Sequence, residues 1–148
     1  MIRFREASRA DVPAVVALLA DDALGTTREG TDLGAYLAAF DAMRAEGGNT
    51  LVVGADDGRI VATYQLTFIS GLSLRASRRA QVESVRVATD RRGQGIGAAM
   101  FADAEARARA AGCRLMQLTM NASRSDARRF YERLGFTPSH IGFKRDLT

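Results

Sequence analysis

The stretch 81–97 reads QVESVRVATDRRGQGIG and decides the fold, because it predicts a strand, a tight basic turn and the start of a helix. The β-branched residues Val82, Val85 and Val87 favour a strand, and no helical spacing fits the apolar positions of this part. Polar residues then interrupt the pattern, and glycines follow at every second position of 93–97. The segment rich in Ala, Met and Phe that comes next favours a helix.

The glycine-rich turn predicts a seat for an anion. Gly93, Gly95 and Gly97 let the backbone turn sharply and bring several N–H groups to one point. The positive end of the helix dipole adds to these donors. Arg91 and Arg92 add full charges, and the planar guanidinium suits phosphate oxygens. The pattern therefore indicates a phosphate-binding loop.

Two common phosphate loops do not fit the spacing. A P-loop requires a Lys-Ser/Thr pair after its last glycine, and an Ala-Ala pair follows Gly97 here. A dinucleotide fingerprint requires a small residue where Met100 stands, and an acidic residue near the position of Asn121. The remaining pattern is Arg92-x-x-Gly95-x-Gly97 after a Val-x-Val strand.

This remaining pattern resembles the diphosphate-binding motif of the GCN5-related N-acetyltransferases, which move an acetyl group from acetyl-CoA to an amine. A second segment, Asn121 followed by ARRFYERLGF at 127–136, resembles the Asn…Phe-Tyr-Glu-x-x-Gly-Phe segment that ends most members of that family. Two matches in the correct order are more specific than either match alone. The resemblance covers Ile2 to Leu147 and is tightest over 83–136.

The resemblance and the periodicity together predict a single N-acetyltransferase domain over residues 1–148. The expected fold is α/β, a mixed central sheet of about seven strands flanked by helices, in the order β-α-α-β-β-β-α-β-α-β-β. Asp56-Asp57-Gly58 between two strand patterns predicts a hairpin. A strand, a glycine turn, a helix and then a strand at 113–120 predict a right-handed crossover. The last strands are expected within 136–147.

Helix starts are predicted at Ser8-x-x-Asp11, at Thr31 and at Ser123-x-x-Asp126, where side chains can cap the first turn. The segments 21–30 and 71–79 are predicted to be loops. In the family that the chain resembles, the first two helices and the loop between them flank the acceptor groove.

Tyr131 is the candidate general acid. Ala127, Phe130 and Leu134 fall on one helical stripe, and Tyr131 lies one position round from Phe130. This placement lets Phe130 anchor the core while the phenol points toward the cofactor. The resemblance implies that the phenol protonates the departing thiolate of CoA. The alternative is a tyrosine that only packs against the pantetheine arm.

Glu83 is the candidate general base that takes a proton from the amine. In a regular strand Glu83, Val85 and Val87 share one face. Some members of the family place a glutamate at this position, and others place it where Gln81 stands, so the fold does not fix the base. The alternatives for Glu83 are a carboxylate that acts through water, one that holds the ammonium, or a solvated or ion-paired strand residue.

The resemblance also implies the residues that bind the cofactor. In this family the central strand and its parallel neighbour separate, and the pantetheine amides bond to the open backbone. A backbone N–H near Val87 would stabilise charge on the acetyl oxygen. Asn121 resembles the residue that bonds the pantetheine portion, although a turn or capping role is the alternative. The implied cofactor-binding set is Val85, Arg86, Val87, Arg92, Gly93, Gln94, Gly95, Ile96, Gly97, Asn121 and Tyr131.

Composition limits the other function classes. The net charge of +4 is made almost wholly of arginine, and the many alanines favour a GC-rich genome over a polyanionic partner. No run of about 20 apolar residues predicts a membrane span. One cysteine and one histidine predict neither a disulfide nor a metal site, and the chain is expected to be cytoplasmic. His140 and Cys113 are expected to be structural.

We therefore expect an acetyl-CoA-dependent enzyme that acetylates a primary amine, in a small molecule more than in a protein, by direct attack in a ternary complex. Direct attack is preferred over an acetyl-enzyme intermediate because no plausible nucleophile lies near the motifs. Two rival hypotheses are a catalytically silent module that binds acyl-CoA and a basic nucleic-acid-binding protein. The low aromatic content disfavours the second. A homodimer is compatible with the resemblance.

Overall fold

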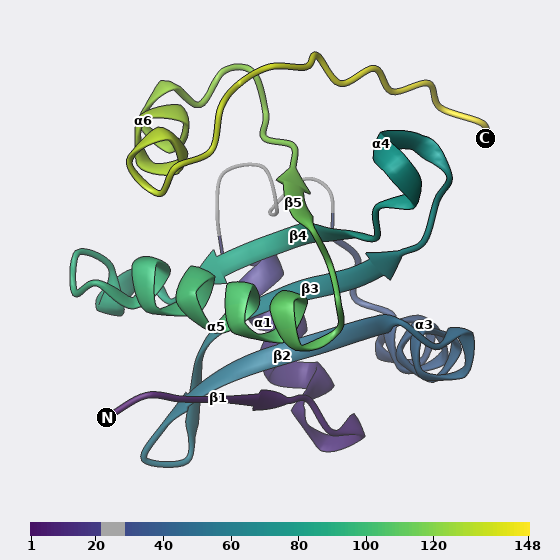
Figure 1. The fold of residues 1–148 in the computed structure, drawn as a ribbon. Helices are drawn as coiled ribbons and strands as arrows, with labels where there is room; N and C mark the ends of the chain where they lie inside the picture. Colours follow the sequence, from purple (N-terminus) through teal and green to yellow (C-terminus); the bar gives the residue numbers. More distant parts are fainter. Residues whose placement is uncertain (22–28) are drawn as a thin grey trace.

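A computed structural model of the chain describes residues 1–21 and 29–148. Figure 1 shows its single sheet with helices on both faces. The elements are β1 (Arg3–Glu6), η1 (Arg9–Asp11), α1 (Val12–Ala20), α3 (Leu33–Glu46), β2 (Asn49–Asp56), β3 (Arg59–Ile69), α4 (Ser73–Ala76), β4 (Arg79–Val87), η2 (Thr89–Arg91), α5 (Ile96–Ala110), β5 (Leu115–Leu118) and α6 (Ser125–Arg133).

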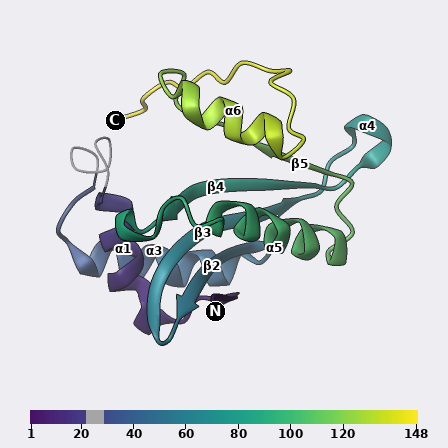
Figure 2. The ribbon, with the colours of Figure 1, turned by 90° about the vertical axis from the view of Figure 1, so that its left-hand side faces the viewer.

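The sheet has the order β1-β2-β3-β4-β5, and β4 and β5 form its one parallel pair among the described residues. Helix α5 connects these two strands, which is the predicted crossover. In Figure 1, α5 lies in front of the sheet, and α1 and α3 lie behind it. Figure 2 shows α6 and the chain that follows it stacked beyond the β4–β5 side.

The core has two parts, one on each face of the sheet. The larger part joins the sheet to α5 and contains Tyr64, Leu66 and Met100, which are all fully buried. The smaller part joins Val61 of β3 to Leu18 of α1. Because alternate residues of β3 serve opposite faces, both layers of helices are fixed to the same strand.

Several predicted boundaries are confirmed. Asp57 and Gly58 have φ of 50° and 80°, so the hairpin turns as its Asp-Gly sequence requires. The Ser8 backbone N–H donates to the Asp11 carboxylate at 2.7 Å, and α1 begins directly after this capping box. Part of the loop predicted at 21–30 lies outside the described residues.

Three predicted boundaries are wrong. The cap of α3 is Asp32 and not Thr31, because the Asp32 carboxylate accepts the Ala35 N–H at 3.3 Å. Helix α6 begins at residue 125, two positions beyond the predicted Ser123. The segment 71–79, predicted as a loop, contains the single turn α4, where three non-glycine residues, Leu74, Arg75 and Ala76, take left-handed φ values.

The sheet has five strands and not about seven. The chain after α6 forms no strand with any described residue. Its side chains Ile141, Phe143 and Leu147 are 82–92% exposed. Alternation of apolar and polar residues makes a segment suitable for a strand, but a strand also needs a free edge within reach. This segment passes the end of β5 near Thr119 without pairing to it.

A part-buried polar network joins β3 to α5 and reaches β1, where Arg107 Nη2 donates to the Phe4 carbonyl at 3.4 Å. The Tyr64 hydroxyl donates to Asp103 Oδ2 at 2.6 Å, and Arg107 Nε donates to the same oxygen at 2.8 Å. Burial and the Asp103 carboxylate together raise the pKa of Tyr64, so the phenol stays neutral. The network satisfies a hydroxyl that is closed off from water.

We expect Asp103→Ala to lower the free energy of unfolding by about 1–3 kcal/mol, because it leaves the buried Tyr64 hydroxyl without an acceptor. Tyr64→Phe removes the hydroxyl itself, so no buried donor is left without an acceptor. We therefore expect a smaller loss of unfolding free energy, about 1 kcal/mol. Denaturant unfolding measures both. Glu105→Ala on the exposed side of α5 is the control, with a change within about 0.5 kcal/mol. Equal losses for Asp103→Ala and Glu105→Ala would contradict the assignment.

Candidate functional site

The parallel strands β4 and β5 pair only over the first part of β4, because β5 ends at Leu118. Their register runs from Arg79 opposite Leu115 to Val82 opposite Leu118 and stops there. Strand β4 continues to Val87, while the chain after β5 turns away into the segment before α6. The backbone of residues 83–87 is therefore open on the β5 side. An extended ligand with amide groups could complete this open ladder.

A β-bulge sits at the start of the open part. Ser84 has φ of 54°, and two residues of β4 stand opposite Tyr64, because Gln65 pairs with Glu83 while Thr63 pairs with Arg86. The bulge shifts the alternation of side chains by one residue. The sequence gives no sign of this bulge, because the residue with positive φ is a serine and not a glycine.

The prediction that Glu83 shares a face with Val85 and Val87 is wrong because of this bulge. Val85 and Val87 are half-buried and pack on the core around α5. Glu83 pairs with Gln65 and lies on the opposite face, the one that carries α1 and α3. Its side chain is exposed beside the open part of β4.

Polar side chains form a row across the sheet on the Glu83 face. Asn49, Thr67, Gln81 and Gln117 stand side by side in register on β2, β3, β4 and β5. Gln117 Nε2 donates to Gln81 Oε1 at 2.7 Å, and Thr67 Oγ1 donates to Asn49 Oδ1 at 3.4 Å. Glu83 lies in the next row of residues. Together they make a hydrogen-bonding surface beside a carboxylate.

The N-terminus of α5 lies at the other end of the open strand. Gly95 is the N-cap of this helix with φ of 79°, and Gly93 has φ of 76°. No side chain caps the helix, and its first backbone bond is from Ala99 N–H to the Gly95 carbonyl at 3.1 Å. The N–H groups before Ala99 therefore lack helical acceptors, and the first turn of a helix leaves such donors available to an anion. Arg92 beside them is exposed.

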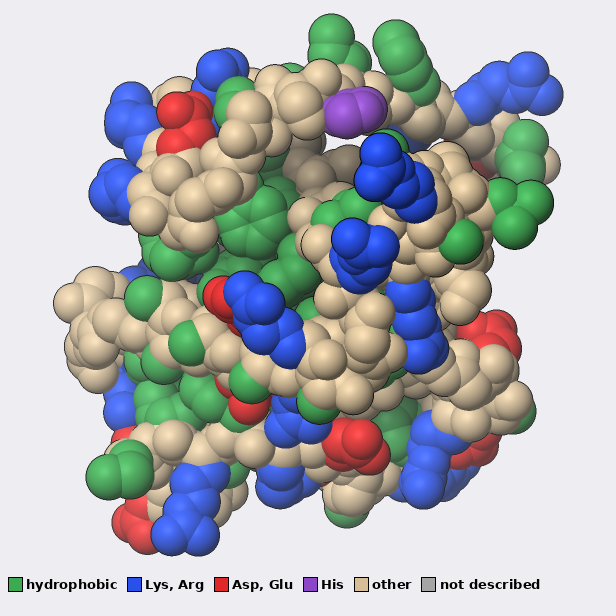
Figure 3. Space-filling model, in the orientation of Figure 1, with side chains coloured by type: hydrophobic (Ala, Val, Ile, Leu, Met, Phe, Trp, Pro, Cys, Tyr) green, Lys and Arg blue, Asp and Glu red, His purple; other side chains and the backbone are tan. Residues whose placement is uncertain are grey.

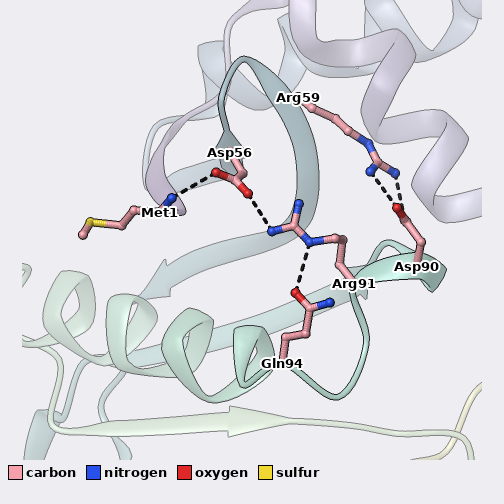
Figure 4. A network of polar contacts seen from close by, with 6 residues as sticks. All are labelled: Met1, Asp56, Arg59, Asp90, Arg91 and Gln94. Carbon is pink, nitrogen blue, oxygen red and sulfur yellow. Dashed lines mark hydrogen bonds and ion pairs between the residues drawn. The ribbon is translucent and has the colours of Figure 1, made fainter.

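Charged pairs hold the turn that leads into this seat, as Figure 4 shows. Arg91 donates to Asp56 Oδ2 at 2.6 Å and to Gln94 Oε1 at 3.2 Å. Arg59 and Asp90 form a bidentate pair at 2.8 Å. Both pairs tie η2 to the β2–β3 hairpin. Arg91 is therefore committed to the fold, whereas Arg92 is exposed and forms no ion pair with any described residue.

We expect Asp56→Ala to weaken binding of CoA about fivefold, because Arg91 and the turn at Gln94 lose their anchor. The rate at saturating cofactor should stay unchanged, because Asp56 ends β2 and does not belong to the open backbone of β4. Calorimetry and steady-state kinetics measure the two quantities. Asp41→Ala, which removes an exposed partner of Arg9, is the matched control and should change neither. A lower saturated rate with unchanged affinity would contradict this role.

Tyr131 packs inside an aromatic group between α5 and α6. Its ring centroid lies 5.5 Å from that of Phe101, 5.4 Å from that of Phe130 and 6.1 Å from that of Phe136, all edge to face. Among the described residues its hydroxyl has no hydrogen-bond partner. Burial raises the pKa of Tyr131, and the charges of Arg124 and Arg86 oppose that rise. The phenol is thus protonated at neutral pH and lies within electrostatic range of β4.

Gly97 explains how α6 approaches this helix. A Cβ at Gly97 would lie 3.0 Å from the Phe130 ring. The small residue therefore serves close packing of Phe130, in addition to the turn that the sequence predicted. Phe130 and Tyr131 both contact the core, so the predicted division between an anchoring Phe130 and an outward Tyr131 is only partly seen.

The remaining candidates have structural contacts. The Asn121 side-chain oxygen accepts from Ser123 N–H at 3.0 Å, which is the turn role weighed against cofactor binding. Arg86 Nη1 donates to the Val85 carbonyl at 2.9 Å on the open strand. Arg78 donates to the Ala111 carbonyl at 2.9 Å and stacks over a phenylalanine ring. Cys113 is half-buried at the far end of β5 from the gap.

None of the helices among the described residues has the length and apolar character needed to span a membrane. Within the same residues, no three His, Cys, Asp or Glu side chains gather closely enough to hold a metal ion.

Comparison with known proteins identifies the class. A model of the acetyltransferase (GNAT) family matches residues 15–136. This chain therefore belongs to the GNAT family, as the two sequence motifs predicted. The α/β fold, a mixed sheet with helices on its faces, matches solved members of the family, although the sheet has five strands among the described residues and not the predicted seven or so.

Particular relatives share the fold or part of the sequence. A transcriptional regulator from Bacillus halodurans C-125 is 40% identical, with a TM-score of 0.95 over 99% of this chain and 100% of that one. The aminoalkylphosphonate N-acetyltransferase of Salmonella typhimurium is 42% identical over 67 residues, which are 45% of this chain and 44% of that protein. A predicted acetyltransferase from Clostridium acetobutylicum, solved with acetyl-CoA, is 18% identical and shares the fold, with a TM-score of 0.78 over 99% of this chain and 97% of that one.

Proposed function

We propose that this protein transfers an acetyl group from acetyl-CoA to the primary amine of a small molecule. The observation that carries the proposal is the parting of β4 from β5 after Val82 and Leu118, which leaves residues 83–87 open between that point and the uncapped N-terminus of α5. A diphosphate fits the α5 end, and a pantetheine chain fits the open strand. Membership of the family and the N-acetyltransferase from Salmonella typhimurium support the same reaction.

The residues present fit acetyl-CoA at the proposed site. Gly93, Gln94, Gly95, Ile96 and Gly97 supply backbone donors to the diphosphate, and Arg92 supplies a cation. The backbone of Val85, Arg86 and Val87 is open toward the pantetheine arm. When bound, acetyl-CoA supplies the activated acetyl thioester. An exposed backbone N–H near Val87 stabilises negative charge on the acetyl oxygen during attack, which is worth a few kcal/mol in comparable sites.

Two side chains carry out the two proton transfers, one from the amine and one to the departing sulfur. Glu83 lies on the face of α1 and α3 and receives a proton from the acceptor amine, directly or through water. Tyr131 lies on the α5 side and donates its proton to the departing sulfur. The gap lies between these faces. This arrangement suits an amine that attacks from one side while the thiolate leaves toward the other.

Direct attack in a ternary complex is favoured over an acetyl-enzyme. Cys113, the sole cysteine, precedes β5 at the end opposite the gap. Burial raises the pKa of its thiol, which lowers the fraction of reactive thiolate. Neither feature suits a nucleophile, so the amine itself attacks the thioester.

Glu83→Gln tests the base. We expect turnover at neutral pH to fall about tenfold to a hundredfold while CoA affinity stays unchanged. The loss should be largest at low pH and shrink as the pH approaches the pKa of the amine, because a free amine no longer needs a base. Glu105→Gln on the outer side of α5 is the control. A wild-type pH profile for Glu83→Gln would remove this role.

The acceptor is tested by CoA release from acetyl-CoA with a panel of amines. The panel includes aminoalkylphosphonates, because of the relative from Salmonella typhimurium, together with polyamines, amino sugars and lysine peptides. We expect rapid release with one class of small amine and none without an amine. CoA binding without transfer to any member would support the silent module instead. Faster reaction with peptides than with every small amine would make the substrate a protein.

A further inference from the structure

The polar row on the Glu83 face has one part that the fold itself uses. Asn49 Oδ1 accepts from Gln65 Nε2 at 3.0 Å and from Thr67 Oγ1 at 3.4 Å. The Asn49 Nδ2 donates to Glu46 Oε2 at 3.2 Å, at the end of α3. Both ends of the Asn49 amide are therefore occupied, and this part of the row fixes β2, β3 and α3 to one another.

The part of the row on β4 and β5 keeps a donor and an acceptor for a ligand. Gln117 Nε2 donates to Gln81 Oε1 at 2.7 Å. The remaining amide atoms, Gln81 Nε2 and Gln117 Oε1, bond to no described residue. Gln117 is exposed and Gln81 is half-buried, so a ligand can reach the pair. An unpaired N–H beside an unpaired carbonyl oxygen is complementary to an amide of a ligand, which offers one acceptor and one donor.

Opposite charges flank this glutamine pair on the same face. Residues 79, 81 and 83 of β4 alternate with the buried residues 80 and 82 of the α5 core, so Arg79 stands in the row on one side and Glu83 in the row on the other. Neither side chain has an ion pair or a hydrogen bond with the residues that the structure describes. The Arg79 guanidinium lies toward the end of β3, where a Cβ at Gly71 would be 3.4 Å from its Nη1.

The other arginines of β4 have different surroundings. Arg86 lies beyond the bulge, beside the backbone proposed for the cofactor, and its Nη1 donates to the Val85 carbonyl at 2.9 Å. Arg78 lies on the α5 face, where its guanidinium is 5.3 Å from the centre of the Phe68 ring. Arg79 is therefore the arginine of this strand that an anion on the glutamine pair would meet away from the cofactor.

The hollow on the other face of the sheet offers no comparable set of groups. It is a groove of about 390 Å³ between α5, β5 and the end of α6, and Figure 3 shows hydrophobic side chains in it. Its walls include Phe101, Met116 and Phe136. The described lining contains no amide side chain, and its one carboxylate, Glu105, is paired with Arg109 at 2.7 Å. A polar amine would lose water there without gaining partners.

The proposed cofactor site sets the direction of the acceptor. Acetyl-CoA extends from the mouth of α5 along residues 85–87, so it approaches Glu83 from the C-terminal side of β4. The rest of the acceptor then extends from Glu83 the other way, over Gln81 and Gln117 toward the start of β4. Neighbouring rows of one face are about 7 Å apart along a strand. An extended chain of two amino acids also spans about 7 Å.

We propose that the acceptor is a short zwitterion in which an amide separates the amine from a carboxylate, as in a dipeptide. Its amine lies at Glu83, its amide bonds to Gln81 and Gln117, and the long side chain of Arg79 turns to its carboxylate. This assignment rests on the proposed acetyl transfer. In that transfer the amine nitrogen bonds to the acetyl carbon, the thioester C–S bond breaks, and the sulfur leaves as CoA with a proton.

Three matched compounds test the acceptor by calorimetry, with CoA present in place of acetyl-CoA so that no transfer occurs. Glycylglycine and δ-aminovalerate have the same length and the same end charges, but only the first contains an amide. Glycylglycine amide keeps that amide and loses the carboxylate. We expect glycylglycine to bind about tenfold more tightly than either. Equal affinity of glycylglycine and one of the other two compounds would overturn the proposal.

Side-chain variants assign each contact. Gln117→Leu should weaken glycylglycine about tenfold and leave δ-aminovalerate unchanged. Arg79→Gln should weaken both and leave glycylglycine amide unchanged. Arg3→Gln, which changes an exposed arginine on the opposite edge of the sheet, is the control and should change none of the three. CoA affinity reports whether each variant is folded. A folded Gln117→Leu that binds all three compounds as the wild type does would contradict the assignment.

Binding and transfer are measured separately, so the two proposals can fail independently. Selective binding of glycylglycine without release of CoA from acetyl-CoA would contradict acetyl transfer and retain the ligand site. Release of CoA that is as fast with hexylamine, which lacks both amide and carboxylate, as with glycylglycine would retain acetyl transfer and overturn this acceptor. We expect release with glycylglycine and much slower release with hexylamine.

Discussion

Tyr131→Phe is expected to lower turnover about 10³-fold while affinity for acetyl-CoA and the stability of the fold remain unchanged. The phenol is the protonated group near the gap, because burial raises its pKa and keeps it neutral through the physiological range. The hydroxyl has no hydrogen-bond partner among the described residues, so its removal costs the fold little. The ring and its contacts with Phe101 and Phe136 are retained.

The separation of kcat from KM makes this test specific. A packing role against the pantetheine arm would appear in the KM for acetyl-CoA, and loss of an acid appears in kcat. Tyr36→Phe is the matched control, because Tyr36 lies on α3 and bonds Glu29 and the Gly30 N–H, away from the gap. Unchanged turnover in Tyr131→Phe would assign the proton to water or to another group.

Gly95→Val is expected to weaken CoA binding about 30-fold or more. A β-branched residue at φ of 79° costs about 1–2 kcal/mol, and the new side chain stands where the α5 N–H groups face the diphosphate. Distortion of the N-cap also turns those donors away from one point. The loss of about 2 kcal/mol corresponds to the 30-fold change. Calorimetry with CoA measures it.

Gly112→Val controls for the strain alone. Gly112 also has φ of 79°, and a Cβ at either glycine meets no atom within 4 Å. Both variants should therefore lose similar thermal stability, because the backbone cost is the same. Gly112 follows the C-terminus of α5, so its variant should bind CoA as the wild type does. If both variants lost CoA affinity equally, the anion seat would not be at Gly95.

Features set by neighbouring residues in the sequence were predictable. The Asp57-Gly58 turn needs left-handed φ values that this pair adopts readily, and the capping box of Ser8 and Asp11 spans a single turn. The glycines before α5 were identified for the same reason. In each case the residue types of a few neighbouring positions are enough to indicate the local backbone conformation.

Features set by contacts across the fold were not predictable. The bulge at Ser84 depends on how β3 meets β4, and without it Glu83 would share a face with Val85 and Val87. Arg91 and Arg92 are neighbours of the same type, and only the hairpin at Asp56 decides that Arg91 is bound and Arg92 exposed. The polar row of Asn49 and Gln117 joins strands far apart in the sequence, although alternation of Gln with apolar residues in each strand signals part of it.

The missing last strands have the same explanation. The spacing of Ile141, Phe143 and Leu147 favours a strand, but it does not say which edge of a sheet would receive that strand. Within one described chain no edge does.

Titration calorimetry of the wild-type protein with CoA and with pantetheine tests the central claim most directly. If backbone donors at the mouth of α5 hold the diphosphate, CoA should bind one to a chain with saturable heat, and pantetheine, which lacks the diphosphate, should bind far more weakly. Equal affinity for the two compounds, or no heat with CoA, would contradict the account.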